Sequence, residues 1–325
     1  MNPEKFVQQQ FTVICQQQVT DAYLLPMGNR YRFLFNHGQE VSDEQSLSPD
    51  LGQKIITYLK YQANMAVSEH RRPQAGAWRW QYQSHQIDIR LSTVGDFQGQ
   101  ESLVLRFIYP LNLREYRMVE PGQWTKLQQL TIGQGLLLFA GPMGSGKTTT
   151  MYRLLREQAV DKVILTIEDP VEITEPRFVQ LQVNTMAGMD YPALLHLGLR
   201  HRPQVLIIGE IRDAATAQCA IEAALSGHLV LATIHAKSAR GVVPRLRQLG
   251  IADYYIDQAL LGACYQRIIP VQGRRQRAVF FDLQSADELL KGNGGGISEA
   301  WQTTLQKLYT EGQITAEVKK AFWNG

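Results

Sequence analysis

Two patterns of hydrophobic and polar positions follow each other along the chain. Up to about residue 110, short runs of alternating apolar and polar residues predict strands at 22–25, 30–35, 86–92 and 102–108. Between them, residues 51–65 carry apolar side chains at helical spacing. The pattern predicts an α+β module with an antiparallel sheet.

From residue 124 onward the apolar runs are continuous and alternate with helices. Strands are expected at 136–140, 163–167, 205–208 and 230–233, and helices after Lys147 and over Tyr191–Leu199 and Ala214–Leu225. Continuous apolar strands between helices favour a parallel sheet covered on both faces, so we expect an α/β domain.

Proline and glycine mark the joints between these parts. They place a linker at 113–122, which predicts domains over 1–112 and 123–325. A glycine-rich stretch at 292–296 predicts a flexible joint. The apolar stripe of the helical segment after it, 298–324, favours packing inside the molecule over a docking surface.

Composition changes this picture little. The chain has 325 residues, of which 44% are hydrophobic and 19% charged, and a net charge of +3. So mild a charge gives no reason to expect direct DNA contact. There is no basic and apolar leader and no uncharged apolar run of about 20 residues, so we expect a cytoplasmic protein that reaches a membrane only through a partner.

The first candidate chemistry is a G-x-x-x-x-G-K-T motif directly after the run 136–140. Such a loop, opening into a helix, directs backbone N–H groups at polyphosphate. Lys147 would reach the β- and γ-phosphates, and the Thr148 hydroxyl would take a place on Mg²⁺. The predicted ATP-binding residues are Gly141, Pro142, Met143, Gly144, Ser145, Gly146, Lys147, Thr148 and Thr149.

Acidic residues follow two other predicted strands, Glu168 and Asp169 after one, Glu210 and Asp213 after the next. The carboxyl ends of parallel strands meet at one edge of a sheet, so these acids are expected beside the phosphate loop. ATP hydrolysis needs one carboxylate for Mg²⁺ and another to orient or deprotonate water. Asp169 and Asp213 are equally well explained as caps of the following helices.

Histidines and arginines complete the set of candidates. His228 and His235 flank the run 229–234, and alternation in a strand would point them to opposite sides, so they are not expected to share a metal. At least one is expected near the γ-phosphate. Arginines that stabilise the charge of phosphoryl transfer are sought in the first module at Arg71, Arg72, Arg90 and Arg106.

Four motifs occur in a recognisable order. They are Gly-Pro-Met-Gly-Ser-Gly-Lys-Thr-Thr-Thr at 141–150, Thr-Ile-Glu-Asp-Pro-Val-Glu at 166–172, Gly-Glu-Ile-Arg-Asp at 209–213 and Ser-Gly-His-Leu-Val-Leu-Ala-Thr-Ile-His at 226–235. The chain thus resembles the type II/type IV secretion ATPase family, with its Walker A, Asp box, Walker B and His box. The resemblance extends upstream through 71–74, 87–92 and 103–108.

This resemblance implies a PAS-like domain followed by a RecA-like ATPase domain, assembled as a homohexamer. It makes Glu168 the general base and Glu210 the acid on the Mg²⁺ side, directly or through water. His228 and His235 become sensors of nucleotide state. Arg90 and Arg106 become γ-phosphate ligands supplied by the same or a neighbouring subunit.

Within the family, 201–204 and 264–270 are most similar to the ATPases of competence pseudopili. That similarity implies a motor at the cytoplasmic face of the membrane that drives pseudopilus assembly for DNA uptake. It would act on an inner-membrane platform protein and only indirectly on pseudopilins. The alternatives are a pilus-retraction or general type II secretion motor, and a nucleotide-gated scaffold with incidental turnover.

Two positions depart from the family pattern. Gln204 stands where many relatives carry an acid, and Ala77 stands where they often carry arginine.

Overall fold

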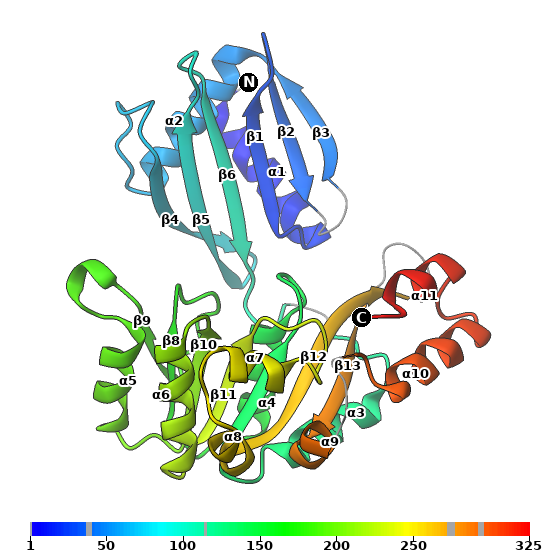
Figure 1. Ribbon diagram of the computed structural model, residues 1–325. Coiled ribbons are helices and arrows are strands. Elements are labelled where there is room, and N and C mark those ends of the chain that lie inside the picture. The colour runs from blue at the N-terminus through cyan, green and yellow to red at the C-terminus, as the bar shows by residue number, and fades with distance from the viewer. Residues whose placement is uncertain (1, 37–40, 114–115, 272–276, 292–295) are drawn as a thin grey trace. The chain divides into compact units, whose positions relative to one another are not determined.

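The computed structural model describes residues 2–36, 41–113, 116–271, 277–291 and 296–325. The chain divides into two compact units, Met1–Arg114 and Glu115–Gly325 (Figure 1). The division falls inside the predicted linker. Most of that linker belongs to the second unit, however, because the Val119 N–H donates to the Val279 carbonyl at 2.9 Å and the Val279 N–H donates to the Arg117 carbonyl at 2.7 Å.

The first unit is an α+β fold. Its elements are α1 (Pro3–Gln17), β1 (Asp21–Pro26), β2 (Tyr31–Asn36), β3 (Val41–Leu47), α2 (Pro49–Gln62), β4 (Gln74–Tyr82), β5 (His85–Gly95) and β6 (Glu101–Ile108). The sheet has the order β3-β2-β1-β6-β5-β4 and all of its pairs are antiparallel, as predicted. The alternation in β5 and β6 buries one face of each strand, with Ile87, Ile89 and Leu91 inward and Arg90 on the other face.

The second unit is an α/β fold. Its elements are α3 (Pro121–Leu130), β7 (Gly135–Ala140), α4 (Lys147–Gln158), β8 (Ile164–Glu168), β9 (Phe178–Gln182), a 3₁₀ turn (Thr185–Ala187), α5 (Tyr191–Leu199), β10 (Val205–Ile211), α6 (Ala214–Leu225), β11 (Leu229–Ile234), α7 (Val242–Gln248), α8 (Asp253–Ala259), β12 (Leu260–Pro270), β13 (Arg277–Ser285), α9 (Ala286–Lys291), α10 (Glu299–Thr310) and α11 (Ala316–Phe322).

The sheet of this unit has the order β13-β12-β7-β11-β10-β8-β9. Its pairs are parallel from β12 to β9, and only β12 and β13 run antiparallel. The four predicted strands are β7, β8, β10 and β11, which lie together in the middle (Figure 1). The carboxyl ends of these four strands therefore share one edge of the sheet.

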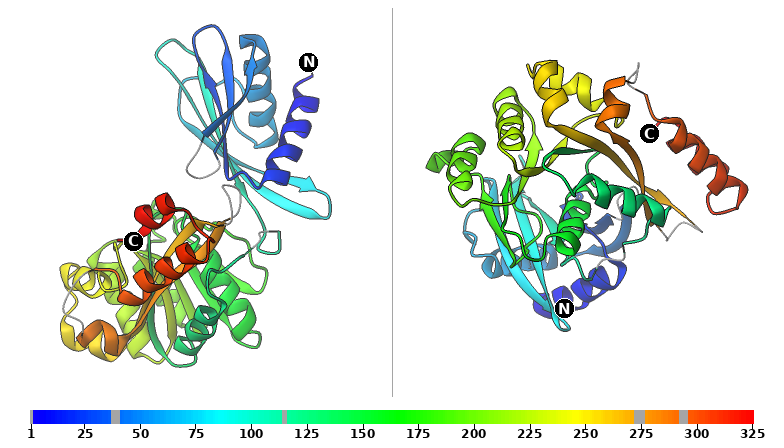
Figure 2. Two further views of the ribbon diagram at one scale, coloured as in Figure 1. Left: turned by 90° about the vertical axis from the view of Figure 1, so that its right-hand side faces the viewer. Right: turned by 90° about the horizontal axis from the view of Figure 1, so that it is seen from below.

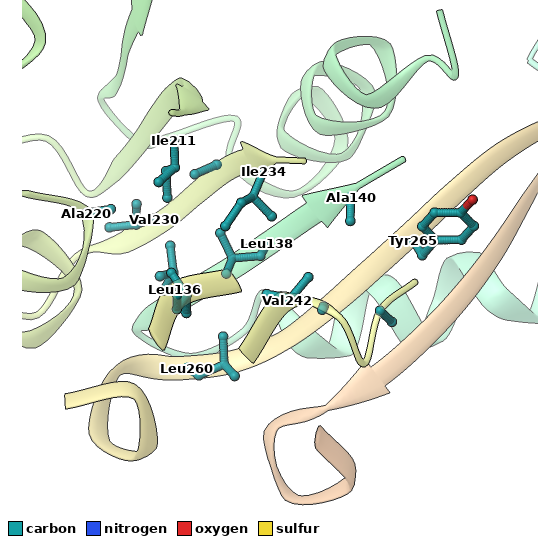
Figure 3. Packing of buried hydrophobic residues seen from close by; sticks show 14 of the residues in the cluster. Leu136, Leu138, Ala140, Ile211, Ala220, Val230, Ile234, Val242, Leu260 and Tyr265 are labelled. Carbon is teal, nitrogen blue, oxygen red and sulfur yellow. The ribbon is translucent and has the colours of Figure 1, made fainter. Parts of the chain in front are cut away.

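Burial on both faces explains why these strands are apolar throughout. Alternate residues of β7 and β11, such as Leu136, Leu138 and Val230, join one hydrophobic cluster with Ala220 of α6 (Figure 3). The residues between them, such as Phe139, are equally buried. This pattern indicates that helices cover both faces of the sheet.

The C-terminal helices α10 and α11, drawn in orange and red, contact β13 and β12 (Figures 1 and 2). The Trp301 ring stacks on Phe280 with 3.9 Å between centroids, and Leu305 and Phe322 are buried in the same cluster. The apolar stripe therefore packs inside the molecule, as predicted. Of the predicted glycine-rich joint, residues 292–295 lie outside the described residues. Among the helices of the described ranges, none is long and apolar enough to cross a bilayer.

Candidate nucleotide-binding and catalytic site

The phosphate loop, residues 141–146, joins the end of β7 to the start of α4. Gly141 has a φ of +138°, and a Cβ there would lie 2.4 Å from the carbonyl oxygen of Gln266. Both the backbone conformation and the space therefore require glycine. The Gln266 side chain also donates to the Ser145 carbonyl at 2.5 Å, so β12 fixes the loop from one side.

The polar groups of this loop suit a phosphate. The Ser145 hydroxyl is buried and has no hydrogen-bond partner among the described residues. Lys147 Nζ donates to the carbonyls of Gly141 and Pro142, at 2.9 Å each. Burial lowers the pKa of Lys147, while the charges of Glu210 and Glu172 oppose that shift. An orphaned donor, an ammonium group and a helix N-terminus together fit a polyphosphate chain.

Thr148 and Thr149 occupy the first turn of α4. The Thr148 hydroxyl donates to Glu172 Oε2 at 3.4 Å, and Thr149 is buried. Glu172 was not predicted as a site residue. The signal in the sequence that could have identified it is its position four residues after Glu168 in the same acidic segment.

An ionic cluster lies at the ends of β10 and β11. Glu210 Oε1 is 2.6 Å from His235 Nε2, and Glu210 Oε2 accepts from Arg212 Nε at 2.5 Å. Arg212 also donates through Nη1 to Asp169 Oδ2 at 3.3 Å. The register pairs Ile234 with Ala140, so the next residue, His235, lies beside the start of the phosphate loop. Arg212 was a further residue that the sequence analysis did not single out.

A magnesium ion would find hard oxygen ligands here. The Thr148 hydroxyl and the Glu210 carboxylate are of the type that Mg²⁺ prefers, together with phosphate oxygens and water. Within the part of the chain that the structure describes, no three His, Cys, Asp or Glu side chains are arranged as a metal site. Thr148 and Glu210 are oxygen donors of the type that Mg²⁺ uses together with the phosphates of a nucleotide.

The side chain of Glu168 is buried. It is 3% exposed, and its Oε1 accepts from Tyr152 at 2.5 Å and from Thr166 at 2.7 Å. Burial raises its pKa, and the two hydroxyl donors oppose that rise. The Glu168 side chain is thus buried at the end of β8, and its role as the general base stays a prediction.

His228 lies at the opposite end of β11 from His235. It precedes β11, its carbonyl accepts from the Gly135 N–H at 3.0 Å, and its Nδ1 lies 3.0 Å from the Ala223 carbonyl. It thus lies at the amino edge of the sheet, about 20 Å of strand away from the edge that carries the phosphate loop. Six strand residues separate the two histidines, and the role of His228 as a sensor of nucleotide state stays a prediction.

The two aspartates behave differently from each other. Asp213 caps α6, since its Oδ1 accepts from the Thr216 N–H at 2.8 Å, and this bond lowers the pKa of its carboxyl. Asp169 instead holds Arg212. The capping explanation is therefore confirmed for Asp213 alone.

The candidate arginines belong to the first unit. Arg90 and Arg106 are directly opposite each other in the β5–β6 register. Arg106 Nε also pairs with Asp21 at 2.8 Å. They share one face of that sheet, and their role toward a phosphate stays a prediction.

Known proteins resemble this chain along nearly its whole length. The family described as "Type II/IV secretion system protein" matches residues 2–309. The "Competence protein ComGA" of Streptococcus pneumoniae is 41% identical over 300 residues, covering 91% of this chain and 90% of that one. The Bacillus subtilis protein of the same name is 33% identical over 257 residues, covering 78% and 72%.

Solved structures share the fold. The Legionella pneumophila ATPase DotB superposes with a TM-score of 0.78 at 17% identity, covering 99% of this chain and 95% of that one. The pilus retraction motor PilT with bound ADP gives 0.67 at 21% identity, covering 97% and 95%. The predicted fold class is thereby confirmed. The chain belongs to the type II/IV secretion system protein family.

Proposed function

We propose that this chain hydrolyses ATP. The observation that carries the proposal is the shared edge of the sheet. There the phosphate loop with its orphaned Ser145 hydroxyl follows β7, His235 follows the neighbouring β11, and His235 contacts Glu210 of β10. Family membership supports the same chemistry.

Each residue has a distinct part in the proposed reaction. Lys147 would exchange the carbonyls of Gly141 and Pro142 for β- and γ-phosphate oxygens, which costs little because the amine is already desolvated. Thr148 and Glu210 would hold Mg²⁺, which supplies positive charge to the transferred phosphoryl group when it is bound. His235 would report the nucleotide's state through its contact with Glu210.

Glu168 would accept the proton of the attacking water. A carboxyl whose pKa is raised by burial is a stronger base than an exposed one, so it suits this task once water reaches it. Such access requires the segment around Glu168 to loosen from α4 during the cycle.

We further propose that the working form is a homohexameric motor for competence pseudopilus assembly. The similarity to the two ComGA proteins supports this more than it supports retraction or general secretion. The motor would act at the cytoplasmic face of the membrane through an inner-membrane platform protein, and on pseudopilins only through that partner.

ATPase assays of the purified protein test the enzymatic proposal. We expect Lys147→Ala to lose ATP binding and turnover, and Glu168→Gln to keep ATP binding while kcat falls about 100-fold or more. Lys162→Ala, an exposed lysine beyond the end of α4, is the matched control. Wild-type protein that binds ATP without turnover would instead favour the nucleotide-gated scaffold.

Replacement of the chromosomal gene tests the biological role. We expect the Glu168→Gln chain to abolish DNA uptake and pseudopilus assembly in the host. Normal DNA uptake by that strain would contradict the motor.

A further inference from the structure

Tyr152 is a buried polar residue of α4 that the proposed mechanism does not use. We propose that Tyr152 is a positioning residue, whose hydroxyl holds the Glu168 carboxylate against the phosphate-loop helix and couples it to the nucleotide. This inference rests on the proposed role of Glu168 in hydrolysis.

The hydrogen bonds around Tyr152 orient its hydroxyl toward Glu168. The Gln180 amide is oriented from both ends, because its Oε1 accepts from the Glu175 N–H at 2.8 Å and its Nε2 donates to the Ile173 carbonyl at 2.7 Å. The same Nε2 donates to the Tyr152 hydroxyl at 2.8 Å. The Tyr152 O–H in turn donates to Glu168 Oε1, at 2.5 Å.

Both partners are sealed from solvent. Tyr152 is 0% exposed and Glu168 3%. Hydrogen bonds to a charged acceptor contribute more than neutral ones, and removing one in a buried place leaves the acceptor short of a donor. The Tyr152–Glu168 bond therefore has a large influence on where the carboxylate lies and on whether it keeps its charge.

The register of α4 links this bond to the nucleotide. Thr148 and Tyr152 are four residues apart and lie on the same face of the helix. Thr148 contacts Glu172, and Tyr152 contacts Glu168, which is four residues earlier in the facing segment. The helix α4 and the segment 168–172 are therefore joined by two contacts, Thr148–Glu172 and Tyr152–Glu168. A ligand that binds Thr148 alters the first contact and, through it, the position of Glu168 in the second.

Within the described ranges of the chain, mostly neutral groups face Glu168. Besides Tyr152 on α4, β8 contributes the neutral Thr166, β9 contributes Gln180, and the Glu172 N–H donates to the carboxylate. Burial raises the pKa of Tyr152, so it stays a donor. On the side of β10, Gly209 packs against Glu168.

Titratable groups of the neighbouring segments have partners of their own. The hydroxyl of Tyr191 lies at Gly209, and burial raises its pKa to about 12. Glu210 is engaged with Arg212 and His235, and Glu172 faces Thr148. The donors from Tyr152 and Thr166 are therefore the main groups that oppose the effect of burial on Glu168.

The test is the pH profile of steady-state ATP hydrolysis by Tyr152→Phe. A lost donor favours the protonated base, so the acid limb of kcat should move to higher pH. We expect a loss of kcat of about tenfold on the acid side that shrinks toward alkaline pH, with an unchanged KM for ATP. Thr166→Val removes the other hydroxyl donor and should shift the limb in the same direction.

Tyr265→Phe is the matched control, since it removes a buried tyrosine hydroxyl that accepts from Arg267, while the Tyr265 ring packs against Trp301. Its profile should keep the wild-type shape. An equal loss at every pH in both Tyr152→Phe and Thr166→Val, or no change in either, would overturn the proposal. Glu168→Gln, assayed alongside, separates the two ideas: wild-type kcat in that variant rejects the catalytic role of Glu168 itself.

Discussion

At the scale of single residues, the phosphate loop is constrained from outside as well as from within. Gly141 is surrounded by the Gln266 carbonyl and the Ser145 hydroxyl, and Gly146 lies against the Gln266 amide. The shape of the loop is thus set in part by β12, a strand that carries none of the four motifs. Lys147 completes this loop, because its ammonium group donates to the backbone carbonyls of Gly141 and Pro142.

Replacing Gly141 by alanine should damage both stability and binding. The added Cβ would meet a backbone oxygen at 2.4 Å in a backbone conformation that L-residues avoid, so we expect a loss of at least about 2 kcal/mol and no detectable ATP binding. Denaturant unfolding and titration with a fluorescent ATP analogue measure the two effects.

The control for this prediction is Gly250→Ala. Gly250 has a φ of +86° with nothing within 4 Å of the added Cβ, so that variant carries only the backbone strain, about 1 kcal/mol. Equal costs in the two variants would mean that the contact with Gln266 is unimportant.

At the scale of elements, α10 is attached to the sheet by a buried carboxyl. Asp282 of β13 is 2% exposed and accepts from the Ser298 N–H at 3.1 Å and from its hydroxyl at 2.6 Å. Ser298 in turn caps α10 by accepting from the Trp301 N–H at 3.2 Å. Burial raises the pKa of Asp282 above its ordinary value of 3.8, and the bonds from Ser298 oppose the shift.

This shift predicts a pH dependence of stability. When the folded-state pKa of an acid is raised, its contribution to the free energy of unfolding is greatest below the unfolded pKa and is lost as pH rises through the folded pKa. Asp282→Asn cannot titrate, so the variant's free energy of unfolding should rise relative to wild type as pH increases from about 4.

Denaturant unfolding across this pH range checks the sign. Asp287→Asn serves as the control, because Asp287 is 81% exposed in its side chain and pairs only with Lys291 among the contacts of the described residues. A difference between wild type and Asp282→Asn that stays constant with pH would contradict the expected titration.

At the scale of the whole molecule, the chain carries two folded units with complementary candidate groups. The second unit holds the phosphate loop and its acids, and the first presents Arg90 and Arg106 side by side on one sheet face. An arginine supplied by a neighbouring subunit can stabilise the charge of phosphoryl transfer. We propose this arrangement for Arg90.

Mixing two inactive variants tests it. The Arg90→Ala variant keeps an intact phosphate loop, and the Lys147→Ala variant keeps Arg90. If Arg90 acts between subunits, about one quarter of the sites in rings mixed at a 1:1 ratio should combine an intact loop with an arginine and be active. ATPase activity against protein concentration, with particle size measured on the same samples, gives the result. Mixtures that stay inactive, although each variant assembles, would place Arg90 in the site of its own chain.

The sequence by itself determined the four central strands of the second unit and the helices α4, α5 and α6, but it did not predict β9, β12 or β13. Residues 136–140, 205–208 and 230–233 are apolar throughout because both faces of the sheet are covered, and this local property predicts the parallel strands and the edge where the phosphate loop lies. The same property places Lys147 and Glu210 at one edge of the sheet. Both lie at the carboxyl ends of strands that run parallel to each other.

Only the tertiary structure decided which way the side chains at these ends turn. Glu168 is drawn inward by Tyr152 from a different element, Arg212 joins Asp169 to Glu210, and β12 supports the loop through Gln266. His228 falls at the far edge because strand length separates it from His235. Such contacts join residues distant in sequence, so no local pattern of hydrophobic and polar positions contains them.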